Sequence, residues 1–260
     1  MNFTYSPERL AALEVSLSTD RLSYYVRECG GDLEAAMRMY QLNTNLSAAF
    51  YIPLQGIEVA VRNQLNVALS ARFGANWYDL SVIKFEARHA EDVNEAVREA
   101  TKQDANGNDI YPTNGEVVAA LRFGFWVGIL GRRNENEIWR KSLWNAFPHR
   151  GKGNQRQAVH GALDSIRQLR NLVAHHRRIL HRNLLADHEN ILTVAGWVCP
   201  HVRDWIEAHR TFDPNMLPVP QATLPNMGLP AMDQIPPATP LASEPQPTLS
   251  GRPRLGIATK

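Results

Sequence analysis

Helix signals follow one another along the first 212 residues of this chain, and signals for β-strands are scarce. Capping residues stand in front of apolar positions spaced three and four apart, which is the period of an amphipathic helix. The clearest starts are Ser6, Thr19, Asp32, Thr113 and Asn134. Each such helix carries an apolar face that needs a partner surface, so the pattern predicts an all-α helical bundle.

Prolines mark where the expected helices bend or end. The run that starts after Asp32 keeps its apolar period up to Ala68, and Pro53 is expected to kink it or split it in two. Pro148 is expected to end a later helix, and Pro200 to kink or split the last one. These later helices are expected over residues 85–102, 117–130, 138–147, 154–174 and 184–208.

The composition changes after Phe212. Eleven of the 16 prolines lie between Pro214 and Pro253, mixed with small and polar residues. Such a sequence cannot bury enough apolar surface to offset the entropy of ordering it. We therefore expect a helical domain over residues 1–212 and a disordered, Pro-rich tail over residues 213–260, with a proline-rich docking motif as the alternative.

Global charge and hydropathy exclude several classes of protein. The formal net charge is only +2, which is far from the strongly basic balance of a general nucleic-acid binder. The first residues lack the basic and apolar regions of a signal peptide, and no apolar stretch reaches the length of a membrane span. The sequence is thus expected to be that of a soluble, cytoplasmic protein.

Charge is concentrated in one segment, residues 167–182, which contains five arginines and three histidines. Cations are common at helix C-termini because they interact favourably with the helix dipole. That effect accounts for one or two arginines, but it does not account for three histidines among them. The segment is therefore the candidate locus for chemistry.

Helical geometry leaves the arrangement of this segment open. Arg170 falls at the edge of the apolar stripe of the helix, where a cation is costly unless it has a partner. His175 follows five residues later, about 140° further round an unbroken helix. The two side chains converge if the helix breaks near Ala174, or if a second copy of the chain completes the site.

The segment Arg170-Asn171-Leu-Val-Ala-His175 resembles the arginine–histidine signature of HEPN domains, in which four to six residues separate the two. Its surroundings are similar to those of Abi-like proteins, the abortive-infection members of this group. The similar features are Ile166-Arg167-x-Leu169 before the motif, His176 and Ile179 after it, the segments 188–194 and 197–205, and Glu58-Val-Ala-Val-Arg62-Asn63-Gln-Leu65. The resemblance extends over most of residues 15–210 and leaves the tail outside it.

The resemblance implies a HEPN-type helical bundle with additional helices and a metal-independent endoribonuclease activity in phage defence. Arg170 would hold the scissile phosphate, Asn171 would orient a partner or contact the phosphate, and His175 would be the general acid or base. The 2′-hydroxyl of the RNA would attack and leave a cyclic phosphate. Since the chain has one copy of the motif, the resemblance implies a homodimer with a composite active site.

Further residues around the motif are candidate RNA contacts: Arg167, His176, Arg177, Arg62 and Asn63. Glu58 and Arg62 lie one helical turn apart. Without any role in binding, the two side chains are expected to form an ion pair within one helix. No cofactor or metal is expected, because the adjacent His175 and His176 cannot easily bind one ion and no cysteine or carboxylate cluster accompanies them.

Two other classes of function stay open from the sequence. The same basic segment suits a non-catalytic module that holds a structured non-coding RNA without cutting it. The helical surface or the tail also suits a partner protein that neutralises or activates another subunit, such as an antitoxin. Cleavage of a bound RNA separates the first class from the ribonuclease, and co-purification of a protein identifies the second.

Overall fold

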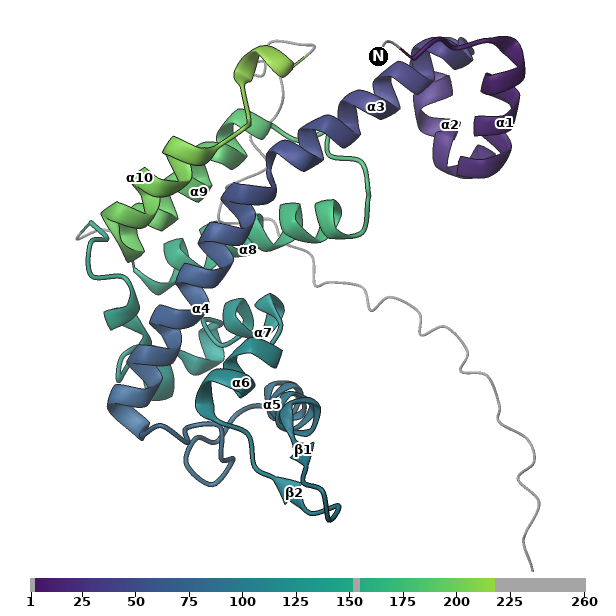
Figure 1. Cartoon of the computed structure of the whole chain (residues 1–260). Helices are drawn as coiled ribbons and strands as arrows, with labels where there is room; N and C mark the ends of the chain where they lie inside the picture. Colours follow the sequence, from purple (N-terminus) through teal and green to yellow (C-terminus); the bar gives the residue numbers. More distant parts are fainter. Residues whose placement is uncertain (1–2, 152–154, 218–260) are drawn as a thin grey trace, which may run out of the picture. The chain divides into compact units, whose positions relative to one another are not determined.

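The computed structural model describes residues 3–151 and 155–217, and this part of the chain is built almost entirely from helices (Figure 1). Its only β-strands are β1 (Lys102–Gln103) and β2 (Asp109–Ile110), which pair antiparallel around a polar loop. The all-α fold predicted from the sequence is confirmed. Among the helices of the described ranges, none has both the length and the apolar character needed to cross a bilayer.

Four helices form the first third of the chain: α1 (Pro7–Leu17), α2 (Thr19–Glu28), α3 (Leu33–Ala49) and α4 (Tyr51–Phe73). The split expected in the long run is present, but it falls at Phe50 and not at Pro53. Pro53 lies in the first turn of α4, where a residue without an N–H removes no intrahelical hydrogen bond. Proline is therefore compatible with the new helix, and the chain bends just before it.

The middle of the chain contains α5 (Ala87–Ala100), α6 (Asn114–Ala120) and α7 (Phe123–Gly128). The expected capping box is present, since Thr113 and Glu116 each accept a hydrogen bond from the other's backbone amide, at 3.4 and 2.9 Å. The single helix predicted over residues 117–130 is wrong. It is divided at Leu121 and Arg122, whose backbones are extended.

The helix predicted over residues 138–147 is also wrong. The segment is a 3-10 turn η1 (Arg132–Asn134), a π-helical turn η2 (Glu135–Trp139) and a second 3-10 turn η3 (Leu143–Ala146). Fully buried Ser142 lies between the last two turns, and its hydroxyl donates to the backbone carbonyl of Ala68 on α4 at 2.7 Å. A buried hydroxyl needs such a partner, so this tertiary bond prevails over the local helix preference.

The last helices are α8 (Arg156–Ala174), α9 (Leu184–Val198) and α10 (Pro200–His209), with the expected break directly before Pro200. A final 3-10 turn, η4 (Pro214–Met216), lies inside the range expected for the tail, and Met216 and Leu217 pack against the core. The rest of the expected tail, residues 218–260, lies outside the described residues.

A continuous apolar core joins α4 to α7, α8, α9 and α10. Helix α4 packs along α9 and α10, while α8 packs on α9 and α7 (Figure 1). Fully buried aromatic side chains fill the space between them, among them Phe50, Trp77 and Trp126. The indole N–H of Trp77 donates to Asn66 on α4 at 2.8 Å, so this large side chain is buried without a lost hydrogen bond. This core fixes α8, and α8 carries the candidate motif at its end.

Candidate functional site

The motif lies where α8 ends, and the helix breaks directly after Ala174. The amide of His176 donates to the carbonyl of Val173 at 3.1 Å, and the amide of Arg177 donates to that of Leu172 at 2.7 Å. These two bonds form the Schellman arrangement, in which the residue after the C-cap is left-handed and is usually glycine. Here that residue is His176, with φ at 52°. The helix thus breaks near Ala174, which is one of the two conditions under which Arg170 and His175 were expected to converge.

The turn at the helix end exposes the histidines. His175 is the C-cap residue, with φ −97° and ψ 16°, and its amide still donates to the carbonyl of Asn171 at 3.1 Å. Both His175 and His176 are exposed, and so is Arg177. No hydrogen bond or ion pair within the described residues involves the side chain of Arg177. A free imidazole and a free guanidinium therefore face solvent at the end of α8.

Arg170 is held by a carboxylate from another helix. Its Nε donates to Glu58 Oε2 at 3.0 Å, and its Nη2 donates to Glu58 Oε1 at 3.4 Å. The Arg170 side chain is 38% exposed and that of Glu58 is 20% exposed. This contact between α8 and α4 explains how a cation is stable at the edge of the apolar stripe. It also leaves one side of the guanidinium open to solvent.

The ion pair expected between Glu58 and Arg62 is wrong. Both oxygens of Glu58 face Arg170 on α8, which lies 112 residues away in the sequence. The Nε atom of Arg62 is buried and has no hydrogen-bond partner in the described part of the chain. Asn63 is exposed. Arg62 therefore lies one turn along α4 from the Glu58–Arg170 pair and belongs to the same neighbourhood, although not as the partner of Glu58.

A polar face of α8 leads to the motif. His160, Asp164, Arg167 and Asn171 share one side of an ideal helix. Arg167 Nε donates to Asp164 Oδ1 at 2.8 Å, so its cation is paired within its own helix. Burial lowers the pKa of His160 below 6.5, and the carboxylate of Asp164 opposes that shift. Burial thus disfavours the protonated form of His160, while Asn171 continues the polar face up to the helix end.

The segment after the motif is anchored by buried polar contacts that the sequence did not reveal. Arg182 donates to both oxygens of Asp187, at 2.7 and 2.6 Å, and the two side chains are 3% and 5% exposed. The amide of Ile179 donates to Asn43 Oδ1 on α3 at 2.8 Å. Burial, together with Arg178 and Arg182, lowers the pKa of His181. Arg182 and His181 therefore belong to the scaffold of this segment.

The candidate residues are brought together only in part. Arg170 and Asn171 lie in the last two turns of α8 and His175 is its C-cap, but within the described residues no hydrogen bond or ion pair joins their side chains to one another. Arg170 turns towards α4, and His175 turns to solvent. Two residues near the motif were missed by sequence reasoning: Glu58 as the partner of Arg170, and Arg21 of α2, whose Nη1 donates to the carbonyl of His176 at 2.8 Å. Contacts over such sequence distances leave no local signal.

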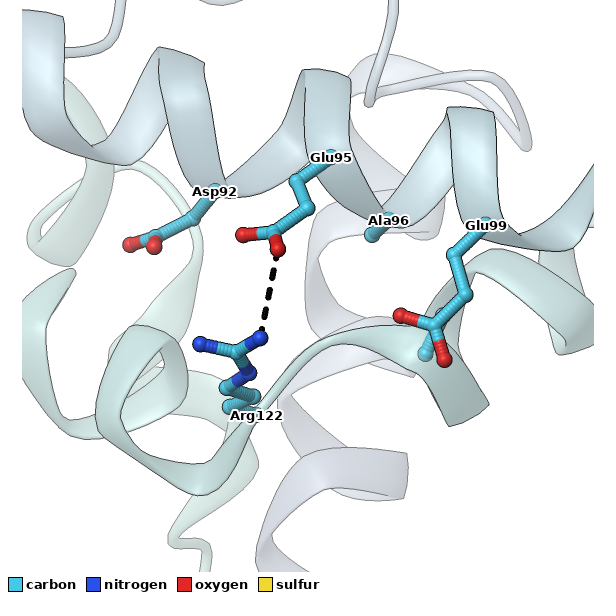
Figure 2. Close-up of a pocket in the computed structure, with 6 residues that line it drawn as sticks. Asp92, Glu95, Ala96, Glu99 and Arg122 are labelled. Carbon is cyan, nitrogen blue, oxygen red and sulfur yellow. Dashed lines mark hydrogen bonds and ion pairs between the residues drawn. The ribbon is translucent and has the colours of Figure 1, made fainter. Parts of the chain in front are cut away.

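A shallow pocket elsewhere has the wrong charge for a polyanion. It lies between α5 and the segment from α6 to α7, and Figure 2 shows Glu95 directed at Arg122, with Asp92 and Glu99 on either side of Glu95 along α5. Arg122 pairs with Glu95 at 3.2 Å, and burial raises the pKa of Asp92. Three carboxylates against one guanidinium repel phosphate groups. In the described ranges, no three His, Cys, Asp or Glu side chains gather as a metal site would require.

Comparison with known proteins gave one match. A family model described as "Abi-like protein" matches residues 19–181, which is more than half of the chain. The matched range begins at the first residue of α2 and includes Glu58, Arg170 and the whole motif. No curated protein and no solved structure matches the chain.

Proposed function

The chain belongs to the family of Abi-like proteins, a name that refers to abortive infection, and on this premise we propose that it is a metal-independent endoribonuclease of the HEPN type that acts in phage defence. The observation that carries the proposal is the end of α8. There a half-exposed arginine, an asparagine and an exposed histidine lie within six residues, and the helix breaks beside the histidine. The arginine and the asparagine have donors for a phosphate, and the histidine can transfer a proton.

Arg170 would hold the scissile phosphate. An arginine has five N–H groups, and Glu58 accepts two of those of Arg170. Three remain to donate to phosphate oxygens on the exposed side. Because Glu58 fixes the guanidinium from behind, the donors are preorganised for the charge that develops on the phosphate. Asn171, on the same final turns, would contact the phosphate or orient the substrate.

His175 would transfer the proton, since imidazole gains and loses one near neutral pH. A base takes the proton of the 2′-hydroxyl, the 2′-oxygen attacks phosphorus, and the bond from phosphorus to the 5′-oxygen breaks. An acid then gives a proton to that 5′-oxygen, which leaves a 2′,3′-cyclic phosphate and a 5′-hydroxyl. The step needs one base and one acid, and each chain has one motif. A homodimer that joins two motifs would supply both histidines.

The RNA strand would extend over the surface around the motif. Arg177 and His176 are exposed beside His175, and Asn63 is exposed on α4. Arg177 is the strongest candidate, because its guanidinium is not paired in the described part of the chain. Arg167 and Arg62 are weaker candidates. Arg167 is paired with Asp164, and the Nε of Arg62 is buried. These contacts would bind the backbone and so depend on salt.

A second candidate is a non-catalytic module that holds a structured non-coding RNA. The observation that favours it is that Arg170 pairs with Glu58 and forms no hydrogen bond with His175, both of which the structure describes. In this reading the exposed cations bind RNA and no proton transfer occurs. In both proposals, a regulatory RNA or an antitoxin protein would be the partner that controls the chain.

Cleavage of a labelled mixed-sequence RNA in EDTA tests the proposal. The full-length protein, His175→Ala and the control His201→Ala are compared; His201 is an exposed histidine on α10, away from the motif. We expect wild type and the control to cut and to leave cyclic-phosphate ends, and the His175 variant to lose about 100-fold or more in rate. Equal cutting by all three proteins would refute the role of His175.

A gel shift of the same samples separates the two candidates. Binding of intact RNA by all three proteins, with affinity that falls steeply as salt rises, supports the non-catalytic module. Absence of both binding and cleavage removes RNA as the ligand of the isolated chain.

A further inference from the structure

The N-terminal arm, defined as α1, α2 and the first half of α3, has a small apolar cluster of its own. Four buried side chains, Leu22, Tyr25, Ala36 and Met37, lie in it. None of them belongs to the continuous core, whose first member along the chain is Leu46. Within the described residues, the arm is therefore joined to the rest of the domain by α3 itself and by polar contacts from α2.

Those contacts reach the motif. Arg21 Nη1 donates to the backbone carbonyl of His176 at 2.8 Å, across 155 residues of sequence. Three residues further along α2, the ring of Tyr24 lies under the guanidinium of Arg178, with 3.4 Å from the ring centre to the guanidinium carbon. Arg21 and Tyr24 face the same loop because they lie one turn apart. Helix α2 thus holds the loop at two points, on either side of Arg177.

His176, whose carbonyl accepts the hydrogen bond from Arg21, also has a strained backbone. His176 has φ at 52°, in the left-handed region that a side chain with a Cβ rarely adopts. The carbonyl that receives the Arg21 bond is that of His176 itself. A hydrogen bond from a charged donor is stronger than a neutral one, so it stabilises the conformation that glycine would adopt without help. The position of the neighbouring His175 depends on this turn.

We propose that helix α2 is the positioning element of the motif: Arg21 and Tyr24 hold the loop 175–178 in its left-handed turn and so keep His175 in place at the end of α8. The consequence for RNA cleavage rests on the proposed function, but the hold on the loop does not. A loop released from α2 samples other conformations, and the fraction of molecules with His175 in position falls.

Hydrogen exchange of the full-length protein measures the hold directly. The amides of His176 and Arg177, both bonded to α8 carbonyls, report on the turn in peptides that cover residues 172–179. Arg21→Gln and Tyr24→Leu are compared with the controls Arg27→Gln and Tyr24→Phe. Within the described residues, the side chain of Arg27 pairs with Glu28 and lies over the ring of Tyr24, both on α2, and phenylalanine keeps the ring under Arg178.

We expect the first two variants to speed exchange of these amides about tenfold, because Arg21→Gln removes a charged hydrogen bond and Tyr24→Leu removes a cation–π contact. The controls should match wild type, and exchange in the core helices should not change, because Arg21 is exposed. Adding His176→Gly to Arg21→Gln should restore protection, since glycine needs no help in the left-handed region. Wild-type protection in Arg21→Gln and Tyr24→Leu overturns the proposal.

Cleavage kinetics separate positioning from direct contact with RNA. If Arg21 positions His175, Arg21→Gln lowers kcat about tenfold and leaves KM within about twofold. If Arg21 binds phosphate directly, KM rises, the salt dependence of binding weakens, and the positioning role is refuted. If no protein cuts RNA, the proposed function fails, while the exchange experiment still decides whether α2 holds the loop.

Discussion

Side chains of the same type have opposite roles within one short segment of this protein. Arg182 is 3% exposed and forms a bidentate pair with Asp187, so its charge is used entirely inside the fold. Arg177 is exposed and unpaired among the described residues, and its donors face solvent. Arg170 stands between these cases, paired with Glu58 on one side and open on the other. The environment of each guanidinium, and not the count of arginines, decides which one can bind a phosphate.

His188 shows how a buried imidazole makes stability depend on pH. It packs against Phe50 and Phe212, and its Nε2 is buried without a hydrogen bond, 3.9 Å from a carboxylate oxygen of Glu207. Burial lowers its pKa below 6.5, and Glu207 opposes this only in part. The unfolded chain therefore binds the proton at a higher pH than the folded chain does. The contribution of neutral His188 to the free energy of unfolding is fully present above pH 6.5 and is lost as the pH falls below it.

We predict that His188→Phe weakens the pH dependence of unfolding. Phenylalanine keeps the contacts with the two aromatic rings and cannot take up a proton. Urea unfolding at about pH 7.5 and about pH 5.5 should show a smaller loss of the free energy of unfolding in the variant than in wild type. Some loss should remain, because burial also lowers the pKa of His89, His160 and His181. An equal loss in both proteins would contradict the assignment to His188.

At the scale of the helices, α4 and α10 pack closely at Gly56 of α4, which has no Cβ. A Cβ on Gly56 would lie 2.8 Å from Cγ1 of Ile206 and 3.4 Å from the ring of Trp205, both on α10. Real Cβ atoms do not approach so closely, so a larger residue would push the two helices apart. Gly161 of α8 is instead in an open position, since a Cβ on Gly161 would meet no atom within 4 Å. The two sites provide a matched comparison.

We predict opposite effects for the same change at these glycines. Gly56→Ala should lower the free energy of unfolding by about 1–3 kcal/mol, because it overpacks the contact between α4 and α10. Gly161→Ala should raise it by about 0.5–1 kcal/mol, because alanine loses less backbone entropy within a helix. Chemical denaturation of both variants measures the difference. Destabilisation by both changes, to a similar extent, would show that the space around Gly161 is not free.

At the scale of the whole molecule, the site proposed for catalysis is half complete in one chain. One Arg170 and one His175 are present, and their side chains form no hydrogen bond or ion pair with each other in the described part of the chain. Proton transfer in RNA cleavage needs a base and an acid. A closed, symmetric dimer is the simplest assembly that supplies two histidines, because each chain then contributes the same surface.

We therefore predict a homodimer as the active form. Light scattering should give twice the mass of one chain, which is 29.3 kDa. The cleavage rate per chain should fall on dilution below the dissociation constant of the dimer, whereas a monomeric enzyme keeps its rate per chain constant. A monomeric mass with constant specific activity would exclude a composite site and leave His175 to act alone.

The sequence by itself determined the structural features that depend on residues close together along the chain. The all-α class follows from apolar periodicity, and the capping box at Thr113 and the break before Pro200 follow from local backbone chemistry. The motif was found because Arg170 and His175 are close in sequence. The condition for its geometry, a helix break near Ala174, also followed from the number of residues per helical turn.

Only the tertiary structure decided which groups are partners. Glu58 pairs with Arg170 and not with Arg62, because α4 and α8 both pack against α7 and α9, which brings together residues that are 112 positions apart. The helix expected over residues 138–147 gave way to irregular turns, because buried Ser142 bonds to Ala68 on α4. Arg21 of α2 meets the carbonyl of His176 for the same reason. Such contacts depend on where whole helices lie, and no local pattern in the sequence encodes that position.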